Sequence, residues 1–485
     1  MKRRLLGGAA VIAAGGLASK IIGALYRIPL TNIIGAEGIG LYQMVFPVYC
    51  ALLTVSSTGI PTALSKLVSQ DRDNGEAYFI RSVLAFGAIG LLGSAIMFVL
   101  GGIFAKLQGN ANAAACYMAL SPSVFLVSLI SCVRGYFQGK SNMVPTAVSQ
   151  IVEQVVKAVV GLAVCSWFKG NAVAGAVCAT LAVTASEGVA LLFLYIRLKA
   201  AGFKRKYIAS EKGAYRKIFA IVAPVAVAAM AIPLGNVADS FIVINATSGF
   251  SENATAAFGI YSGSVAAIIG VPVSLAYGVA VALIPAVSSG SDERAIADSL
   301  RFTGFLSIPF AVFFAVFSRQ VIDLLYGGMS QSERMLASTL LSLEAASVVL
   351  TSYLQTTNAI LTARGRQRVP MLSMGIALVA RVVLCAALSA IRAVGIYGAV
   401  AASVISQAVA LAINVKTALG REGALRGLID TWQPLIWSII CVLGGFFVCN
   451  AVGGRLVFVL VSLAVAAAYS VLPVFKILKV GAKRV

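Results

Sequence analysis

The sequence predicts an all-α, polytopic membrane protein with about fourteen transmembrane helices. Of its 485 residues, 60% are hydrophobic and only 11% are charged, whereas about 25% of residues are charged in an ordinary soluble domain. A soluble fold with so few polar residues could not cover its surface. Each helix that crosses a bilayer needs about 20 mostly apolar residues, and apolar runs of this length recur along the whole chain.

The predicted spans are separated by short charged or glycine-rich loops. Their approximate limits are 7–34, 40–68, 80–105, 115–138, 144–167, 171–196, 217–245, 257–287, 300–318, 335–361, 369–390, 396–416, 434–450 and 456–475. The first run resembles a secretory signal, with basic residues before an apolar stretch. Because the apolar character continues well past residue 20, we expect an uncleaved first helix, bent near Pro29.

Basic residues predict the orientation of these spans, since Lys and Arg are retained in cytoplasmic loops. With the N-terminus inside, cytoplasmic loops hold most of them, and the most basic loop covers residues 197–217. The external basic residues are Lys106, Lys169, Arg319, Arg334, Arg392 and Arg455. We therefore expect a bacterial plasma-membrane protein with both termini in the cytoplasm. The net charge of +21 does not indicate nucleic-acid binding, because the cations lie in alternate loops rather than on one face.

An internal repeat crosses the 197–217 loop. IPTALS at 60–65 matches IPAVS at 284–288, and GAVCAT at 175–180 matches GAVAAS at 398–403, at nearly the same offset. Matching segments lie six spans apart, so the two copies share one orientation, as in transporters with parallel repeats. This predicts six-helix bundles at 1–200 and 215–417, with two additional helices in 430–485.

The residue inventory contains no catalytic or metal-binding constellation. The chain has no His and eight Cys, which are scattered through apolar segments without a CxxC pair and are interpreted as packing residues. It also lacks a glycine-rich phosphate loop, so ATP is not the predicted energy source. We expect no enzyme activity, no cofactor and no metal.

Ionisable residues at membrane depth are the candidate functional residues, because their burial is costly. Lys20 and Arg27 lie two helical turns apart in the first span and share one face, which suits a diphosphate in a water-filled cavity. The alternative is that such cations extend to the interface, which fits Lys66 and Arg134 best.

Two further groups of charged residues are candidates. Glu153 and Lys157 are spaced i,i+4 in the fifth span, so they either pair within the helix or contact a ligand. The candidates for ion coupling are Asp239, Glu187, Glu344 and Arg381. For Asp239 the alternative is a structural ion pair with Arg381.

Particular segments also carry a family resemblance. GAEGIGLYQM, TGIPTALSK and RGYFQGKSNMVPTAVSQIVEQVVK, all within residues 35–157, resemble the stage V sporulation protein B group of polysaccharide biosynthesis proteins. These belong to the multidrug/oligosaccharidyl-lipid/polysaccharide exporter superfamily. The resemblance implies two six-helix bundles plus two helices, a central cationic cavity, and rocking between inward-open and outward-open states.

In lipid II flippases of this superfamily, basic residues of the first span meet the diphosphate within an S-R-x-x-G-like stretch. Here Ser19-Lys20-Ile21-Ile22-Gly23 takes that place, and Arg27 follows. The sequence has no arginine in the cavity-facing parts of the second and eighth spans, where Gram-negative flippases carry further basic residues. A polyprenyl-linked glycan other than lipid II therefore remains an alternative substrate.

The function implied by the resemblance is translocation of a polyprenyl-diphosphate-linked glycan, such as lipid II or a related cell-wall or spore-cortex precursor. The substrate-binding candidates are Lys20, Arg27, Glu153, Lys157 and Arg134. The alternative is a cation- or proton-coupled multidrug antiporter, although basic residues in the cavity would repel cationic drugs. Expected partners are the lipid-linked oligosaccharide, membrane lipids and cell-wall synthesis enzymes, with no nucleic acid, and we expect a monomer.

Overall fold

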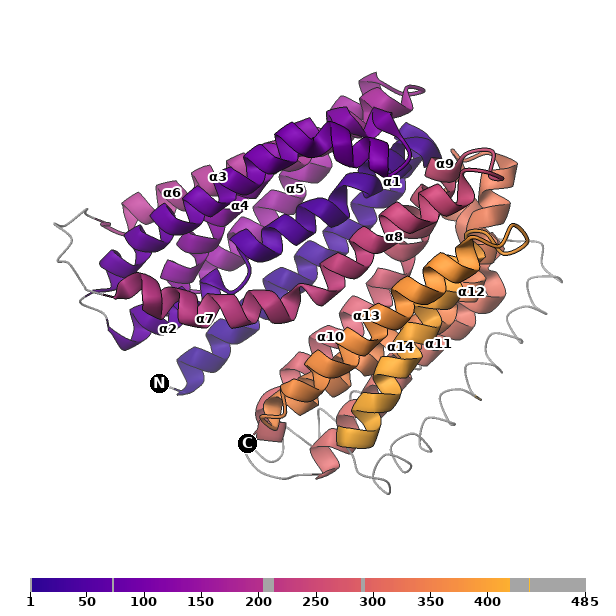
Figure 1. Cartoon of the computed structure of the whole chain (residues 1–485). Coiled ribbons are helices and arrows are strands. Elements are labelled where there is room, and N and C mark those ends of the chain that lie inside the picture. The colour runs from indigo at the N-terminus through magenta and orange to yellow at the C-terminus, as the bar shows by residue number, and fades with distance from the viewer. Residues whose placement is uncertain (1, 72–73, 204–212, 289–292, 419–435, 437–485) are drawn as a thin grey trace. The chain divides into compact units, whose positions relative to one another are not determined.

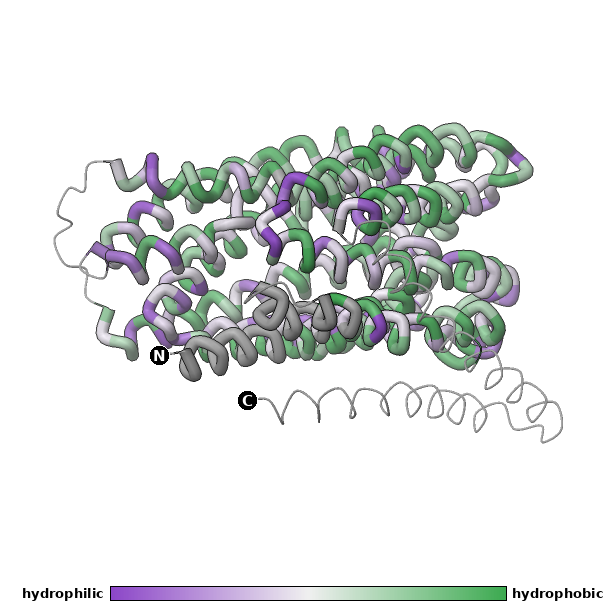
Figure 2. Tube along the Cα trace, turned by 90° about the horizontal axis from the view of Figure 1, so that it is seen from below, coloured by the Kyte–Doolittle hydropathy of each residue, from purple (hydrophilic) through white to green (hydrophobic). Residues whose placement is uncertain are grey.

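The computed structural model describes residues 2–71, 74–203, 213–288 and 293–418, together with residue 436. These residues form helices without any strand, which confirms the predicted all-α class. Ten of the described helices are long and apolar enough to cross a membrane, or eleven if one bent pair is counted as a single span. Hydrophobic residues predominate along their lengths (Figure 2).

The first helix, α1 (Lys2–Ser56), contains the first predicted span and most of the second. Together with α2 (Ile60–Gln70) its apolar part covers 56 residues, which as one straight helix would be roughly 84 Å long against a hydrocarbon core of about 30 Å. It is interrupted at Gly35, where φ is 75° and ψ is 176°. A side chain would be strained in this conformation, so the interruption depends on glycine. Pro29 lies inside the helix six residues before this interruption, and the bend predicted near it stays a prediction.

Contacts on either side of Gly35 show that the chain reverses there. Before it, Gly15 packs against Ala147 and Tyr26 against Gly161, so this half runs parallel to α5 (Val144–Trp167). After it, the Tyr117 hydroxyl reaches the Met44 carbonyl oxygen at 3.4 Å. Further on, Ile60 lies beside Gly135, so this half runs parallel to α4 (Ala114–Gly139). Helices α4 and α5 are joined by a short turn and run in opposite directions, and the two halves of α1 therefore do the same.

The remaining spans of this part of the chain match the predicted limits within a few residues. They are α3 (Gly75–Leu107), α4, α5 and α6 (Ala172–Ala200), with the short 3-10 helix η1 (Ala111–Ala113) before α4. Asn110 and Asn171 cap two helix starts by accepting hydrogen bonds from the backbone N–H groups of Asn112 and Ala174. Figure 1 shows these helices side by side.

Helices α7 (Ala214–Ala229) and α8 (Ala231–Thr247) correspond to the seventh predicted span, which is bent by 46° between them. The eighth predicted span is built from α9 (Ala254–Gly259), the π-helical turn η2 (Ile260–Val265) and α10 (Ala266–Ser288). The chain divides at this point into two compact units, residues 1–259 and 260–485. The predicted division into six-helix bundles at 1–200 and 215–417 stays a prediction.

The second unit contains α10, α11 (Glu293–Leu325), α12 (Gln331–Ala363), α13 (Arg368–Ser389) and α14 (Tyr397–Ala418). A capping box starts α12, in which the Ser330 hydroxyl accepts from the Glu333 N–H and the Glu333 carboxylate accepts from the Ser330 N–H. Asn414 ties α14 to α12 and α13, with a 2.6 Å bond to Asn358 and a 2.7 Å bond from Ser373. The predicted spans 434–450 and 456–475 lie outside the described residues.

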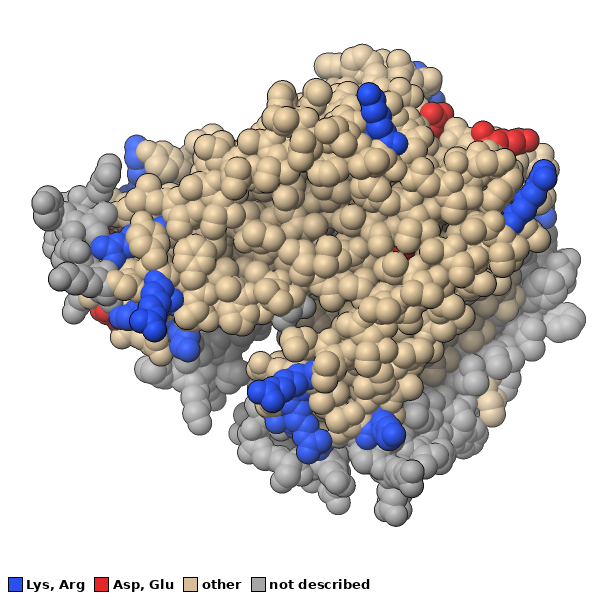
Figure 3. Space-filling model, viewed as in Figure 1, with Lys and Arg blue, Asp and Glu red and all other residues tan. Residues whose placement is uncertain are grey.

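Several loops predicted to be cytoplasmic lie at one end of the first unit. Aromatic rings pack there between helix ends, with centroids 4.8 Å apart for Phe79 and Tyr136 and 5.4 Å apart for Phe79 and Phe203. Lys140 and Lys217 lie over the neighbouring rings of Tyr136 and Tyr78. Figure 3 shows basic side chains gathered at this end, while most of the visible face between the ends carries no charge.

Candidate functional site

A polar site lies inside the first unit where the first half of α1 packs against α5. Small residues allow the close approach: a Cβ atom at Gly23 would lie 3.0 Å from Gln154 Oε1 and 3.9 Å from Lys157 Nζ. One turn later, the Tyr26 hydroxyl contacts α5 at Gly161. The polar side of α5 predicted from its sequence therefore faces α1 rather than lipid.

Two basic side chains belong to this contact, one from each helix. The Lys157 ammonium lies 5.8 Å from the centre of the Tyr26 ring, within cation–π range. Arg27, the next residue along α1, is near enough for its charge to act on Lys157, as are the charges of Glu153 and Glu187. Both Lys157 and Arg27 are half-buried.

Arg134 brings α4 to the same site. Its guanidinium donates to Glu153 Oε2 at 3.1 Å and to the Ser149 hydroxyl at 2.9 Å. Gln154 donates to the other oxygen of Glu153 at 3.2 Å. Within the described part of the chain, the ion pair of Glu153 is with Arg134 and not with Lys157, so the intrahelical pairing considered for Glu153 and Lys157 is not what neutralises Glu153.

Glu187 on α6 is the deepest carboxylate near the site, with 3% of its surface exposed. The Tyr49 hydroxyl, from the second half of α1, donates to Glu187 Oε1. The other carboxylate oxygen, Oε2, is buried without a hydrogen-bond partner among the described residues. A buried carboxylate with one free oxygen can take up a proton or a cation.

The other predicted residues lie elsewhere. Lys20 is exposed on α1, two turns before Arg27, and Lys66 is exposed near the end of α2. Asp239 on α8 is buried, with 3% exposed, beside Ser240. Glu344 on α12 is also buried, and Arg381 on α13 is half-buried; both belong to the second unit. The predicted pairing of Asp239 with Arg381 would join the two units and stays a prediction.

Sequence reasoning missed the tyrosines of this site. Tyr26 on α1 places its ring beside the Lys157 ammonium of α5. Tyr49 donates a hydrogen bond to Glu187, although 138 residues separate the two in sequence. A second network was missed as well: Gln108 donates to the Met44 carbonyl oxygen and to the Ser240 hydroxyl, both at 2.9 Å, and accepts from Tyr117. Polar residues within otherwise apolar spans are a usable signal, because each must find a hydrogen-bond partner in the membrane.

This arrangement can bind an anion. Arg27 and Lys157 lie together at membrane depth, and the described residues include no carboxylate within ion-pair distance of either. Arg134 is already neutralised by Glu153. Charge-assisted hydrogen bonds to an anionic group are therefore chemically available to the two cations.

Comparison with known proteins gives the family. Residues 5–291, more than half of the chain, match the family described as polysaccharide biosynthesis protein. The chain belongs to this family. The matched residues include all of the site described above.

Relatives of this family member include two proteins of Bacillus subtilis (strain 168). Stage V sporulation protein B is 27% identical over 316 residues, and the match covers 60% of each chain. Lipid II flippase MurJ is 28% identical over 428 residues, covering 79% of this chain and 77% of that protein.

Solved structures share the fold of this family member at low identity. Lipid II flippase MurJ in an inward closed conformation has a TM-score of 0.76 at 14% identity, covering 96% of this chain and 99% of that one. An inward-facing multidrug resistance MATE family transporter has a TM-score of 0.70 at 16% identity, covering 86% of this chain and 95% of that one. These similarities concern the fold, and fold alone does not determine the substrate.

Proposed function

We propose that this protein is a flippase that moves a polyprenyl-diphosphate-linked glycan, such as lipid II or a related cell-wall precursor, between the leaflets of the plasma membrane. The family and the names of the Bacillus relatives support this class of substrate. The task is transport, without covalent chemistry on the substrate.

The observation that carries the proposal is the pair formed by Arg27 and Lys157. Like charges that approach each other at membrane depth are unfavourable unless an anion compensates them. A diphosphate supplies two adjacent anionic groups and would accept hydrogen bonds from both side chains. Lys20, two turns earlier on α1, would meet the headgroup before it reaches this pair.

Alternating access between the two leaflets is the mechanism that we propose. The chain contains two compact units, and transporters with parallel repeats move such units about a central site. Glu187 is our first candidate for the coupling group, because one oxygen of its buried carboxylate has no hydrogen-bond partner among the described residues and its charge acts on Lys157. Asp239, Glu344 and Arg381 remain further candidates.

A multidrug antiporter is the alternative, since MATE transporters share the fold. A cationic drug would be repelled by the charges that would attract a diphosphate. We therefore expect the flippase activity, with both termini in the cytoplasm and the protein acting as a monomer beside cell-wall synthesis enzymes.

Reconstitution tests the proposal directly. Proteoliposomes that hold a fluorescent polyprenyl-diphosphate glycan in both leaflets are treated with an impermeant enzyme that cleaves the glycan. We expect the enzyme to cleave nearly all of the labelled glycan when the protein is present, and about half of it when the protein is absent. The same protein produced in a drug-sensitive strain should not raise resistance to ethidium. Drug resistance without glycan flipping would support the antiporter instead.

A further inference from the structure

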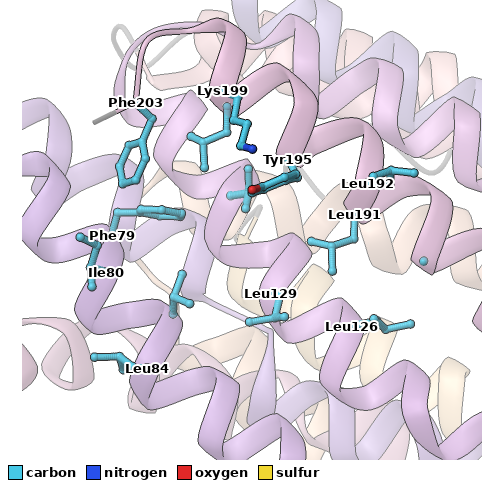
Figure 4. Close-up of a pocket in the computed structure, with 14 residues that line it drawn as sticks. Phe79, Ile80, Leu84, Leu126, Leu129, Leu191, Leu192, Tyr195, Lys199 and Phe203 are labelled. Atoms are coloured by element: carbon cyan, nitrogen blue, oxygen red, sulfur yellow. The ribbon is translucent and has the colours of Figure 1, made fainter. Parts of the chain in front are cut away.

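A second feature of the first unit lies away from the polar site. Helices α3, α4 and α6 enclose an apolar pocket of about 800 Å³, lined mainly by aliphatic residues such as Val83, Leu129 and Leu191. Figure 4 shows Leu129 and Leu191 beside the pocket, with Tyr195, Lys199 and Phe203 near one end. Leu192 and Tyr195 are 57% and 49% exposed, so the pocket opens on the outer surface of the helices.

The position of the pocket corresponds to one leaflet. On α6 its lining runs from Gly188 to Lys199, roughly 16 Å along the helix axis at 1.5 Å per residue. Half of the hydrocarbon core is about 15 Å thick. The end with Lys199 is the end that carries the 197–217 loop, which the charge distribution predicts to be cytoplasmic.

The pocket has space for a chain. A Cβ atom at Gly188 would have no heavy atom within 4 Å, so the glycine leaves the pocket wall open. Apart from Phe79, the side chains that line it on α3 and α4, including Leu84 and Leu126, are aliphatic. A flexible hydrocarbon chain is the group that this surface suits.

Basic side chains lie at the end of the pocket nearest the 197–217 loop. The Lys199 ammonium lies 4.8 Å from the centre of the Tyr195 ring and forms no ion pair with an acidic residue among those the structure describes. Lys140, over the ring of Tyr136, adds a second cation at this end. Aromatic residues and lysines at a membrane interface are typical contacts for lipid headgroups.

We propose that this pocket binds one acyl chain of an anionic phospholipid from the cytoplasmic leaflet, with the lipid phosphate at Lys199. The length of the pocket favours a phospholipid over the polyprenyl chain of the transported glycan, because a polyprenyl chain is much longer than one leaflet. The site is separate from Arg27 and Lys157, and its occupant would be a bound membrane lipid and not the cargo.

Site-specific fluorescence quenching tests the proposal. The full-length protein is prepared with its three tryptophans, Trp167, Trp432 and Trp437, replaced by phenylalanine, and with a single tryptophan introduced by Leu192→Trp. A matched protein carries Ile376→Trp, since Ile376 on α13 is 50% exposed and, like Leu192, lies eight residues from the predicted cytoplasmic end of its helix. Each is reconstituted with brominated phosphatidylglycerol or brominated phosphatidylcholine.

The expected result is that phosphatidylglycerol binds about fivefold more tightly than phosphatidylcholine at position 192, as one lysine near the surface predicts. The preference should be smaller at position 376. Lys199→Gln should remove it at position 192, whereas Lys169→Gln, an exposed lysine at the other end of the unit, should not. Gly188→Leu should reduce quenching by both lipids, and Gly102→Leu, which also meets open space, should not.

Three outcomes would overturn the proposal. Equal binding of the two lipids at position 192 would mean that the pocket does not select a headgroup. An undiminished preference in the Lys199→Gln protein would assign the selectivity to the general surface charge. Displacement of brominated phosphatidylglycerol by a small amount of polyprenyl phosphate would make the pocket a site for the cargo chain.

Discussion

The guanidinium of Arg134 on α4 donates to the carboxylate of Glu153 on α5 at 3.1 Å. This contact occupies the one acidic residue on the polar side of α5, one turn before Lys157. Lys157 and Arg27 form no ion pair among the described residues, and they are the cations that we propose to bind the anionic headgroup. An ion pair between two helices thus determines the charge that the site presents.

Removing either of these cations should impair flipping. Arg27→Gln and Lys157→Gln each eliminate a charge-assisted bond worth about 1.5–3 kcal/mol, so the rate should fall by about 10- to 100-fold at limiting substrate. Arg27→Lys should retain part of the activity if charge alone matters, and little if the planar guanidinium binds two oxygens. The measurement is the proteoliposome assay, with Lys106→Gln, an exposed lysine outside the site, as control. Normal flipping by the double variant would contradict the proposed site.

The Arg134–Glu153 pair should be a stability element. Arg134→Gln leaves the half-buried Glu153 carboxylate without its counter-charge and should lower the free energy of unfolding by about 2 kcal/mol. The double variant Arg134→Gln/Glu153→Gln removes both charges and should recover most of that loss. Thermal unfolding in detergent, followed by size-exclusion fluorescence, gives the comparison. Purely additive losses in the double variant would show that the two residues do not act as a pair.

The orientation can be tested by thiol labelling. In a protein without its native cysteines, Asn112→Cys should react with an impermeant reagent in intact cells, because Asn112 is exposed at the end opposite Lys140 and Phe203. Gln367→Cys, exposed between α12 and α13, should react only after lysis. The reverse pattern would place both termini outside.

Two glycines should be essential for packing α9 against α1. A Cβ atom at Gly40 would overlap the Thr255 carbonyl oxygen, and one at Gly259 would overlap the Gly40 backbone nitrogen. Because backbone atoms cannot move aside easily, Gly40→Val and Gly259→Val should each lower the stability by about 1–3 kcal/mol or more. Gly102→Val, whose side chain would meet open space, is the control. An unchanged melting temperature for Gly40→Val would contradict the close contact.

Local sequence was sufficient to predict where most of the described helices begin and end. The fifth predicted span, 144–167, has the limits of α5, because Pro145 near its start and glycine after its end are signals that act over a few residues. Apolar composition was likewise sufficient to predict the membrane spans, since whether a segment can cross the bilayer depends mainly on its own length and hydrophobicity. The break at Gly35 falls between the predicted spans 7–34 and 40–68, so the apolar pattern placed it correctly, although it did not show that the break would depend on a glycine with positive φ.

The partners of the charged residues were decided by tertiary structure alone. The i,i+4 spacing of Glu153 and Lys157 indicated that they could meet, but it contained no information about Arg134, which arrives from another helix at a shorter distance. The same holds for Tyr49 and Glu187, which are far apart in sequence and joined only by the packing of α1 against α6. The sequence by itself determined which residues enter the membrane, and the three-dimensional packing decided which charges are neutralised and which remain to bind a ligand, because ion pairing depends on distances between helices that no local pattern encodes.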